Sequence, residues 1–381
     1  MREVTGVGKL DEAELRRFGA QVQRLIQGED LSRQEAHALF RDLLLDRQPE
    51  LQQGALLAAL AAKGETVDEI IGAWRAIDEI DTIHTRGELP GPLVENSGTG
   101  MDQLKTFNVS SAAAIVAASL GVKLARHGAR ALTSRCGTVD ILEAVGVDVS
   151  CSVTAVERSL REAGIGLFNG MSPQVHPGAL GRILSQIRFG STLNIAASLA
   201  NPARPTIGLR GVYSPRLVGP VAEVMTAIGY RRGLVVHGTD DASGLGMDEI
   251  SPCGHTVMRR FDENSSEDLE VTPESVGLDR HPTEAIAFSG SIEQEAERFV
   301  QVLAGADHAA CVDFTCLNAA GVLLVAGRCS NLAEGIAQAR SAVEAGQAVA
   351  TLRRWVDAQD GAGEGPARLE QLLRRAGIAG A

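Results

Sequence analysis

From Pro90 onward, short apolar runs alternate with segments of helical periodicity. This alternation is typical of an α/β layer in which helices connect mainly parallel strands. We therefore predict a large α/β domain with a central, mainly parallel sheet flanked by helices. Candidate strands lie at 122–125, 165–168, 207–212 and 234–237, and a short β-rich excursion is expected over 256–272.

The first 88 residues have a different pattern, in which apolar residues recur at helical spacing. Leu15, Phe18, Val22 and Leu25 share one helix face, and Gly28 can end that helix. Two later Ser/Thr-x-x-Glu runs have the spacing of capping boxes, which begin helices. They lie at 32–35 and 66–69, and a further helix is expected over 51–62.

These patterns divide the chain into three parts. We predict a small all-helical domain over 1–88, with a helical segment near 180–202 packed on it, and an α/β domain over 89–359. Within the latter, helices are expected over 291–304 and 309–326, with a last one running from Asn331 through Ala350. The tail over 360–381 reads as a linker into a short helix.

Charge and composition exclude several classes of function. A net charge of −12 disfavours a protein that binds nucleic acid by neutralising its phosphates, and two Trp, two Tyr and nine Phe leave little for base stacking. The longest apolar runs are too short to cross a bilayer. The six cysteines form no C-x-x-C pair, so a reducing cytoplasm is expected rather than a disulfide framework or zinc site.

The stretch from Gly98 to Ser111 has the chemistry of an anion cradle. In the Gly98-Thr99-Gly100 run, glycines allow backbone N–H groups to approach an anion closely, although a plain tight turn explains the run equally well. Asn108-Val109-Ser110-Ser111 stands at the start of an Ala-rich helix, whose dipole favours a phosphate. The alternative is that these residues only cap the helix, which leaves two of the three polar side chains idle.

Further polar residues follow two other candidate strands. Arg126 and Arg130 flank His127 at the end of one strand, where two guanidinium groups can fork onto phosphate oxygens. Asp248 and Glu249 lie in a Gly-rich turn beyond another strand. Adjacent carboxylates are usually solvated surface, but near a diphosphate they would hold magnesium, with Asp102 as a third ligand.

The order of these motifs resembles the anthranilate phosphoribosyltransferases, a glycosyltransferase family that also includes pyrimidine nucleoside phosphorylases. The resemblance runs from about residue 20 to 355, and several motifs at proper intervals are far more specific than any one alone. It rests on Gly-Thr-Gly-x-Asp at 98–102, Thr-Phe-Asn-x-Ser-Ser at 106–111, His-Gly-x-Arg at 127–130, His-Pro at 176–177, Asn-Pro-Ala at 201–203, Gly-Val-Tyr-Ser at 211–214, Val-His-Gly at 236–238 and Asp-Glu at 248–249.

The resemblance implies a homodimer through the helical domain and a cleft at the hinge where phosphoribosyl pyrophosphate and magnesium bind. Because pyrophosphate is a good leaving group, no acid or base is assigned among the catalytic residues. Donor binding is implied for Gly98, Thr99, Gly100, Asp102, Thr106, Asn108, Ser110, Ser111, Arg126, Ser134, Arg135 and Gly137. Metal binding is implied for Asp248, Glu249 and Asp102, and acceptor contacts for His127, Ala129, Arg130, Ser172, Pro173, His176, Arg182 and Gln186.

Departures from the family pattern cluster where the acceptor should sit. On that side, Ala129 replaces the asparagine that touches anthranilate. The position of the arginine that pairs with the anthranilate carboxylate falls on or near Gln186, or on Leu184 with a different gap placement, and Arg182 and Arg188 flank it. On the donor side, Met101 replaces a glycine before the aspartate. Arg126 and Arg135 replace lysines there, a swap that keeps charge but not shape.

Three hypotheses follow from this pattern. The first is a magnesium-dependent phosphoribosyltransferase with an altered aromatic acceptor. The second is ordinary anthranilate transfer in tryptophan biosynthesis. The third is a non-catalytic relative that binds nucleic acid, which predicts a basic groove and loss of the Asp248–Glu249 pair; the pair is present and the chain is acidic.

Overall fold

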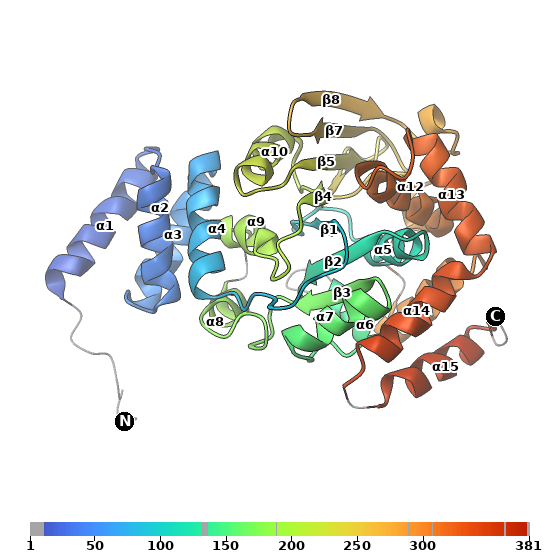
Figure 1. The fold of residues 1–381 in the computed structure, drawn as a ribbon. Helices are drawn as coiled ribbons and strands as arrows, with labels where there is room; N and C mark the ends of the chain where they lie inside the picture. Colours follow the sequence, from blue (N-terminus) through green and yellow to red (C-terminus); the bar gives the residue numbers. More distant parts are fainter. Residues whose placement is uncertain are drawn as a thin grey trace.

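The computed structural model describes residues 11–130, 136–187, 189–288, 290–306, 308–361 and 363–378. Four helices at one end of the molecule precede a sheet that is covered by helices on its faces (Figure 1). This is the predicted fold class, a small all-helical N-terminal domain followed by a large α/β domain.

The helical domain is built as the local sequence signals predict. Its helices are α1 (Glu12–Ile26), α2 (Arg33–Leu44), α3 (Glu50–Lys63) and α4 (Val67–Ile80). Ser32 and Thr66 form the two predicted capping boxes at the starts of α2 and α4. The buried Glu69 also accepts hydrogen bonds from the Leu31 amide and from Lys63, at 2.9 and 3.0 Å, and so ties three segments together.

Two helices from the middle of the chain, α8 (Leu180–Gln186) and α9 (Thr192–Leu199), share the core of the helical domain. Their buried side chains, among them Ile183 and Leu193, belong to one apolar cluster with residues of α1–α4. Asp81, just after α4, accepts hydrogen bonds from the backbone amides of Ala179 and Leu180 at 3.0 and 2.8 Å. The start of α8 is therefore fixed to the end of the helical domain.

The sheet has the order β3-β2-β1-β4-β5-β7-β8, and β6 pairs with β5. The first five strands along this order are parallel, while β7 and β8 extend the sheet in antiparallel fashion. This confirms the predicted strands and the β excursion, although β2 and β5 run longer than predicted. The strands are β1 (Leu93–Gly98), β2 (Lys123–Gly128), β3 (Ile165–Asn169), β4 (Ile207–Gly211), β5 (Arg232–Thr239), β6 (Gly246–Met247), β7 (Thr256–Phe261) and β8 (Ser266–Val271).

Helices pack on the sheet and complete the main core. The largest buried cluster joins α5 (Val109–Ser119) and α12 (Ala309–Val325) to the central strands, and α12–α15 lie on the side of the sheet away from α1–α4 (Figure 1). The remaining α-helices are α6 (Thr138–Ala144), α7 (Val153–Glu162), α10 (Val218–Ala227), α11 (Ile292–Leu303), α13 (Leu332–Glu344), α14 (Gln347–Ala358) and α15 (Gly365–Arg375).

Two details near the C-terminus differ from or extend the sequence-based expectation. The single helix predicted from Asn331 through Ala350 is wrong, because Gly346 adopts a left-handed φ of 71° and separates α13 from α14. The tail helix, α15, is packed: Leu369, Leu372 and Leu373 are buried in the main cluster. Within the described residues, no helix is both long and apolar enough to cross a membrane.

The closest contact between α2 and α4 depends on Gly72, where a β-carbon would lie 2.6 Å from the Arg33 carbonyl oxygen and 2.8 Å from the His37 nitrogen. We expect Gly72→Ala to lower the free energy of unfolding by about 1–3 kcal/mol, because backbone cannot move aside locally. Gly54→Ala on α3, with no atom within 4 Å of the new methyl, is the matched control and should be neutral or stabilising by up to about 1 kcal/mol. Equal thermal shifts for the two variants would contradict this packing.

Candidate active site

A cavity of about 270 Å³ opens at the carboxyl ends of β1 and β2 and is closed on the other side by α8 and α9. Carboxyl ends of parallel strands are where α/β sheets commonly bind ligands. The predicted donor-site residues that line it are Gly98, Thr99, Gly100, Asp102, Thr106, Asn108, Ser110, Arg126 and Gly137, together with His127, Ala129 and Arg130 from the predicted acceptor set and both Asp248 and Glu249.

The loop after β1 is held in shape by backbone contacts. The Thr99 amide donates to the Gly211 carbonyl at 3.0 Å, and the Thr99 hydroxyl accepts from the Tyr213 amide at 3.2 Å. Gly100 and Met101 both have a φ of 67°, in the left-handed region. The chain therefore turns sharply here and presents Asp102 to the cleft.

The amino end of α5 also faces this cleft. Asn108 is the N-cap residue, yet its side chain makes no capping hydrogen bond to the helix. The alternative that these polar residues serve only as a cap is therefore wrong for Asn108. Asn108, Val109 and Ser110 line the cavity, and no acidic residue in the first turn offsets the helix dipole. This end of α5 has the character of an anion site.

Three carboxylates, those of Asp102, Asp248 and Glu249, line the same cavity as the α5 terminus. Asp248 accepts a hydrogen bond from the Gly100 amide at 2.8 Å, and Glu249 accepts a short one from the Ser110 hydroxyl. Burial raises the pKa of Asp102 to about 7, and the nearby charge of Asp248 adds to that rise. Burial and the charge of Asp248 likewise raise the pKa of Glu249 well above its usual value.

The electrostatics of these carboxylates fit a divalent cation. Lys105 is paired with Asp102 at 3.2 Å, yet the pKa of Asp102 stays raised, and so does that of Glu249 although Arg126 lies nearby. Magnesium binds to one or two carboxylates plus phosphate oxygens and water. Among the described residues, no group of three or more His, Cys, Asp and Glu side chains is placed so that it could hold a metal ion. The donor set thus suits a cation that arrives with a phosphorylated ligand.

Glycine at three strand ends makes room for the loop that carries Asp248 and Glu249. A β-carbon on Gly98 would lie 2.5 Å from Asp248 Cγ, and one on Gly211 would overlap the Asp248 backbone. At the end of β5, a β-carbon on Gly238 would lie 2.5 Å from the Glu249 carbonyl oxygen. The acidic loop therefore lies directly on the ends of β1, β4 and β5.

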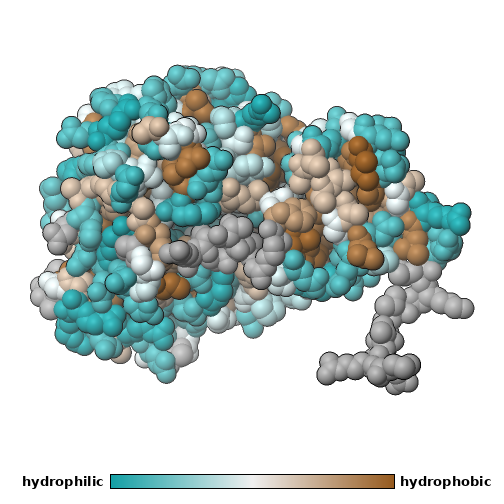
Figure 2. Space-filling view, turned by 180° about the vertical axis from the view of Figure 1, so that it is seen from behind, coloured by the Kyte–Doolittle hydropathy of each residue, from teal (hydrophilic) through white to brown (hydrophobic). Residues whose placement is uncertain are grey.

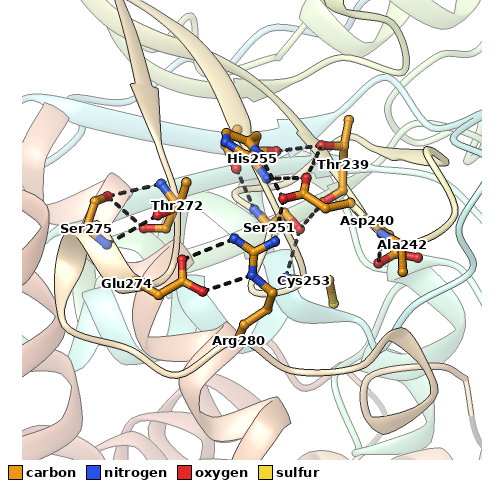
Figure 3. A network of polar contacts seen from close by, with 12 residues as sticks. Thr239, Asp240, Ala242, Ser251, Cys253, His255, Thr272, Glu274, Ser275 and Arg280 are labelled. Atoms are coloured by element: carbon orange, nitrogen blue, oxygen red, sulfur yellow. Dashed lines mark hydrogen bonds and ion pairs between the residues drawn. The ribbon is translucent and has the colours of Figure 1, made fainter.

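The far end of the same loop is braced by a polar network (Figure 3). Asp241 accepts hydrogen bonds from the His255 amide and ring at 2.9 and 2.8 Å, and it pairs with Arg280. Arg280 reaches on to Glu274 at 2.9 Å, while the Ser251 hydroxyl donates to the Thr239 carbonyl at 2.6 Å. These contacts fix both ends of the segment on which the carboxylates sit.

The predicted pair of phosphate-binding arginines is engaged within the protein. The buried Arg126 donates to Asn96 Oδ1 at 3.1 Å and to the Ser111 hydroxyl at 2.7 Å, and Ser111 lies behind the cavity wall. Arg130 pairs with Asp140 and Glu143 of α6 at 3.0 and 2.7 Å. The expectation that both guanidinium groups fork freely onto phosphate is therefore not met in this arrangement. Ser134 and Arg135 lie outside the described residues.

The acceptor side differs most from the sequence-based expectation. Arg182 pairs with Asp46 at 3.2 Å, and the Gln186 amide donates to Glu50 at 3.3 Å, so both side chains face α3 rather than the cleft. Ser172, Pro173 and His176 are likewise absent from the lining. The wall is instead formed by residues outside the predicted acceptor set: Leu180, Leu184, Ile187, Phe189, Leu193, Asn194, Ala197 and Ser198. The recurrence of apolar residues within 180–197 was the sequence signal that could have indicated this wall.

His127 connects this wall to the hinge. Its Nε2 lies 3.1 Å from Nε2 of His176, whose Nδ1 lies 2.5 Å from the Asp81 carbonyl oxygen. A carbonyl only accepts, so His176 Nδ1 carries a proton and its Nε2 accepts from His127. Burial, with the nearby His176 ring, lowers the pKa of His127 to about 3. The ring is therefore a neutral, fixed part of the cleft.

The chain matches the glycosyl transferase family in both parts. Residues 90–349 match its a/b domain and residues 22–79 match its helical bundle domain. The chain belongs to this glycosyl transferase family.

Similar proteins of this family carry one name. The anthranilate phosphoribosyltransferase of Methanothermobacter marburgensis is 36% identical over 87% of this chain and 96% of its own length. Anthranilate phosphoribosyltransferase 2 of Ralstonia nicotianae is 38% identical over 89% and 96%.

Solved structures of the same family share the fold. The Thermus thermophilus anthranilate phosphoribosyltransferase superposes with a TM-score of 0.78 at 33% identity, over 89% of this chain and 98% of that one. The Saccharomyces cerevisiae enzyme in complex with PRPP and Mg gives a TM-score of 0.78 at 25% identity, over 92% and 99%.

The close contact between Gly98 and the Asp248 carboxylate can be tested without any ligand. We expect Gly98→Ala to lower the free energy of unfolding by about 1–3 kcal/mol, because the new methyl overlaps the Asp248 carboxylate. In an Asp248→Ala background the same change should cost markedly less, since the overlapping atoms are gone. Thermal unfolding of the four proteins measures the coupling, and strictly additive effects would contradict the contact. Gly19→Ala on α1, where the new methyl makes an ordinary 3.5 Å contact, serves as the remote control.

Proposed function

We propose that this protein transfers the 5-phosphoribosyl group from phosphoribosyl pyrophosphate to anthranilate, with magnesium, and releases pyrophosphate. The observation that carries this proposal is the meeting of two opposite features in one cleft. The uncapped amino end of α5 attracts phosphate, while Asp102, Asp248 and Glu249 repel it unless a divalent cation stands between. A diphosphate with bound magnesium satisfies both.

The residues of the cleft would act by binding and placement. Backbone amides in the first turn of α5, with the side chains of Asn108 and Ser110, would hold phosphate oxygens. Asp248 and Glu249 would hold the metal, with Asp102 beside them. Bound magnesium would neutralise the charge that develops on departing pyrophosphate. The bond from ribose C1 to pyrophosphate would break as the acceptor nitrogen bonds to C1, and the proton on that nitrogen would pass to solvent. No side chain of the cleft is assigned as acid or base.

The acceptor is proposed to be anthranilate because the similar proteins carry that name. The sequence alone favoured a different aromatic acceptor, since Ala129 and Gln186 replace residues that contact anthranilate. The comparisons give no support to such a change. The apolar wall of α8 and α9 suits a flat aromatic ring of this kind. Place in tryptophan biosynthesis follows from the same proposal.

The non-catalytic, nucleic-acid-binding hypothesis is less well supported. It predicts a basic groove without metal carboxylates, whereas Asp248 and Glu249 line this cleft and Arg126 and Arg130 are engaged within the protein. The relatives are also named as enzymes.

We also propose a homodimer that forms through the helical domain. Hydrophobic residues are visible on the helical-domain side of the molecule (Figure 2). Ile26, Leu45 and Leu51 are 65%, 40% and 88% exposed on this domain and offer apolar surface to a second copy of the chain. Sedimentation of the purified protein tests the point, and a single 40.0 kDa species at micromolar concentration would contradict it.

Replacement of Asp248 by Asn together with Glu249 by Gln should reduce kcat/KM by about 100-fold or more, because both charged ligands of the cation are lost. The measurement is pyrophosphate release from phosphoribosyl pyrophosphate, magnesium and anthranilate. The matched control is Glu263→Gln with Asp279→Asn, which removes the same charges from exposed positions outside the cavity lining. Unchanged turnover in the first double variant would refute the metal assignment, and failure of the parent protein to release pyrophosphate would refute the proposed function.

A further inference from the structure

Met101 has an unusual backbone conformation for its residue type. Its φ of 67° lies in the left-handed region, which side chains with a β-carbon rarely adopt. The preceding Gly100 has the same φ at no steric cost. A methionine that persists in this conformation points to a role for its side chain that offsets the backbone strain.

The side chain of Met101 reaches across the cleft to Gly190. A β-carbon built on Gly190 would overlap the Met101 methyl group and lie 2.5 Å from its sulfur. Among the described glycines with a positive φ, Gly190 does not appear, so its backbone conformation does not require glycine. The absence of a side chain at Gly190 is therefore explained by the space that the Met101 thioether occupies.

This contact joins the two halves of the cleft. Met101 belongs to the loop that carries Asp102, whereas Gly190 directly follows the segment with Ile187 and Phe189 of the apolar wall. Elsewhere that loop is held from the opposite side, because Phe107 donates to the Ile286 carbonyl at 2.7 Å. The thioether thus lies at the boundary between the phosphate-binding side and the apolar side.

We propose that Met101 is a specificity-determining residue. Its thioether packs against the ring of the aromatic acceptor and limits the size of the substituents on the side of the ring that faces the donor loop. This rests on the proposed phosphoribosyl transfer to anthranilate. Methionine suits such a position, because its unbranched, polarizable side chain adapts to a flat ring and makes favourable sulfur–aromatic contacts. No covalent step is added, and Met101 acts only by contact.

The test compares two variants of Met101, both of which keep a β-carbon at the left-handed φ of this position. Met101→Ala removes the thioether, and we expect both the Kd and the KM for anthranilate to rise about fivefold to tenfold. The Kd is measured by the fluorescence of anthranilate itself. Met101→Leu keeps most of the volume and should stay within about threefold of the parent. The KM for phosphoribosyl pyrophosphate should move less than that for anthranilate. The alanine variant should also accept anthranilates with a larger ring substituent.

Several results would overturn this proposal. One is an anthranilate Kd in Met101→Ala that stays within about twofold of the parent value. Another is an equal change in the KM values for anthranilate and phosphoribosyl pyrophosphate, because a merely structural role would produce that result. Gly190→Ala supplies the reciprocal test, because its methyl overlaps the thioether: alone it should weaken anthranilate binding and lower the Tm, and in a Met101→Ala background it should add little to either effect. Additive effects on Tm would refute the contact itself.

Failure of the underlying function would be recognised separately. If the parent protein bound anthranilate but released no pyrophosphate, the transfer reaction would be wrong while the Kd comparison still decided the role of Met101. If it bound no anthranilate, the acceptor role of Met101 would be refuted, and the Tm coupling between positions 101 and 190 would still decide whether the two residues touch.

Discussion

The site depends on how closely the Asp248–Glu249 loop can approach the ends of the parallel strands. Gly98, Gly211 and Gly238 permit that approach, since a β-carbon at any of them would overlap the acidic loop. The same approach lets the Gly100 amide and the Ser110 hydroxyl bind the two carboxylates. Carboxylates that would otherwise be solvated are thereby buried beside the start of α5, where their mutual repulsion creates the demand for a cation.

Much of the fold was predictable because its signals are local. The capping boxes at Ser32 and Thr66 and the apolar periodicity of the first 80 residues specify helices before any tertiary contact forms. The break at Gly346 was missed, because one glycine between two periodic segments is compatible with either a continuous or a divided helix. The packing of α15 depends on distant partners, so the sequence of the tail alone could not decide it.

The donor side of the cleft could be predicted from short sequence motifs, whereas the acceptor side could not. Most predicted donor residues lie in one short stretch, and the structure brings them to one cavity with Asp248 and Glu249. The acceptor wall arises from the packing of α8 and α9 on the helical domain, which no short motif specifies. Arg182 shows the difficulty: its position in the sequence suggested an acceptor contact, but Asp46 on the neighbouring domain binds it instead. The engagement of Arg126 by Asn96 and Ser111 was equally invisible to sequence reasoning.

The central claim is that one cleft holds a diphosphate and its divalent cation between the start of α5 and the three carboxylates. A crystal structure with phosphoribosyl pyrophosphate and Mn²⁺, recorded at the manganese absorption edge, tests it most directly. We expect anomalous density within coordination distance of Asp248 or Glu249 and of pyrophosphate oxygens at the α5 terminus. Manganese and pyrophosphate located away from both carboxylates would contradict it.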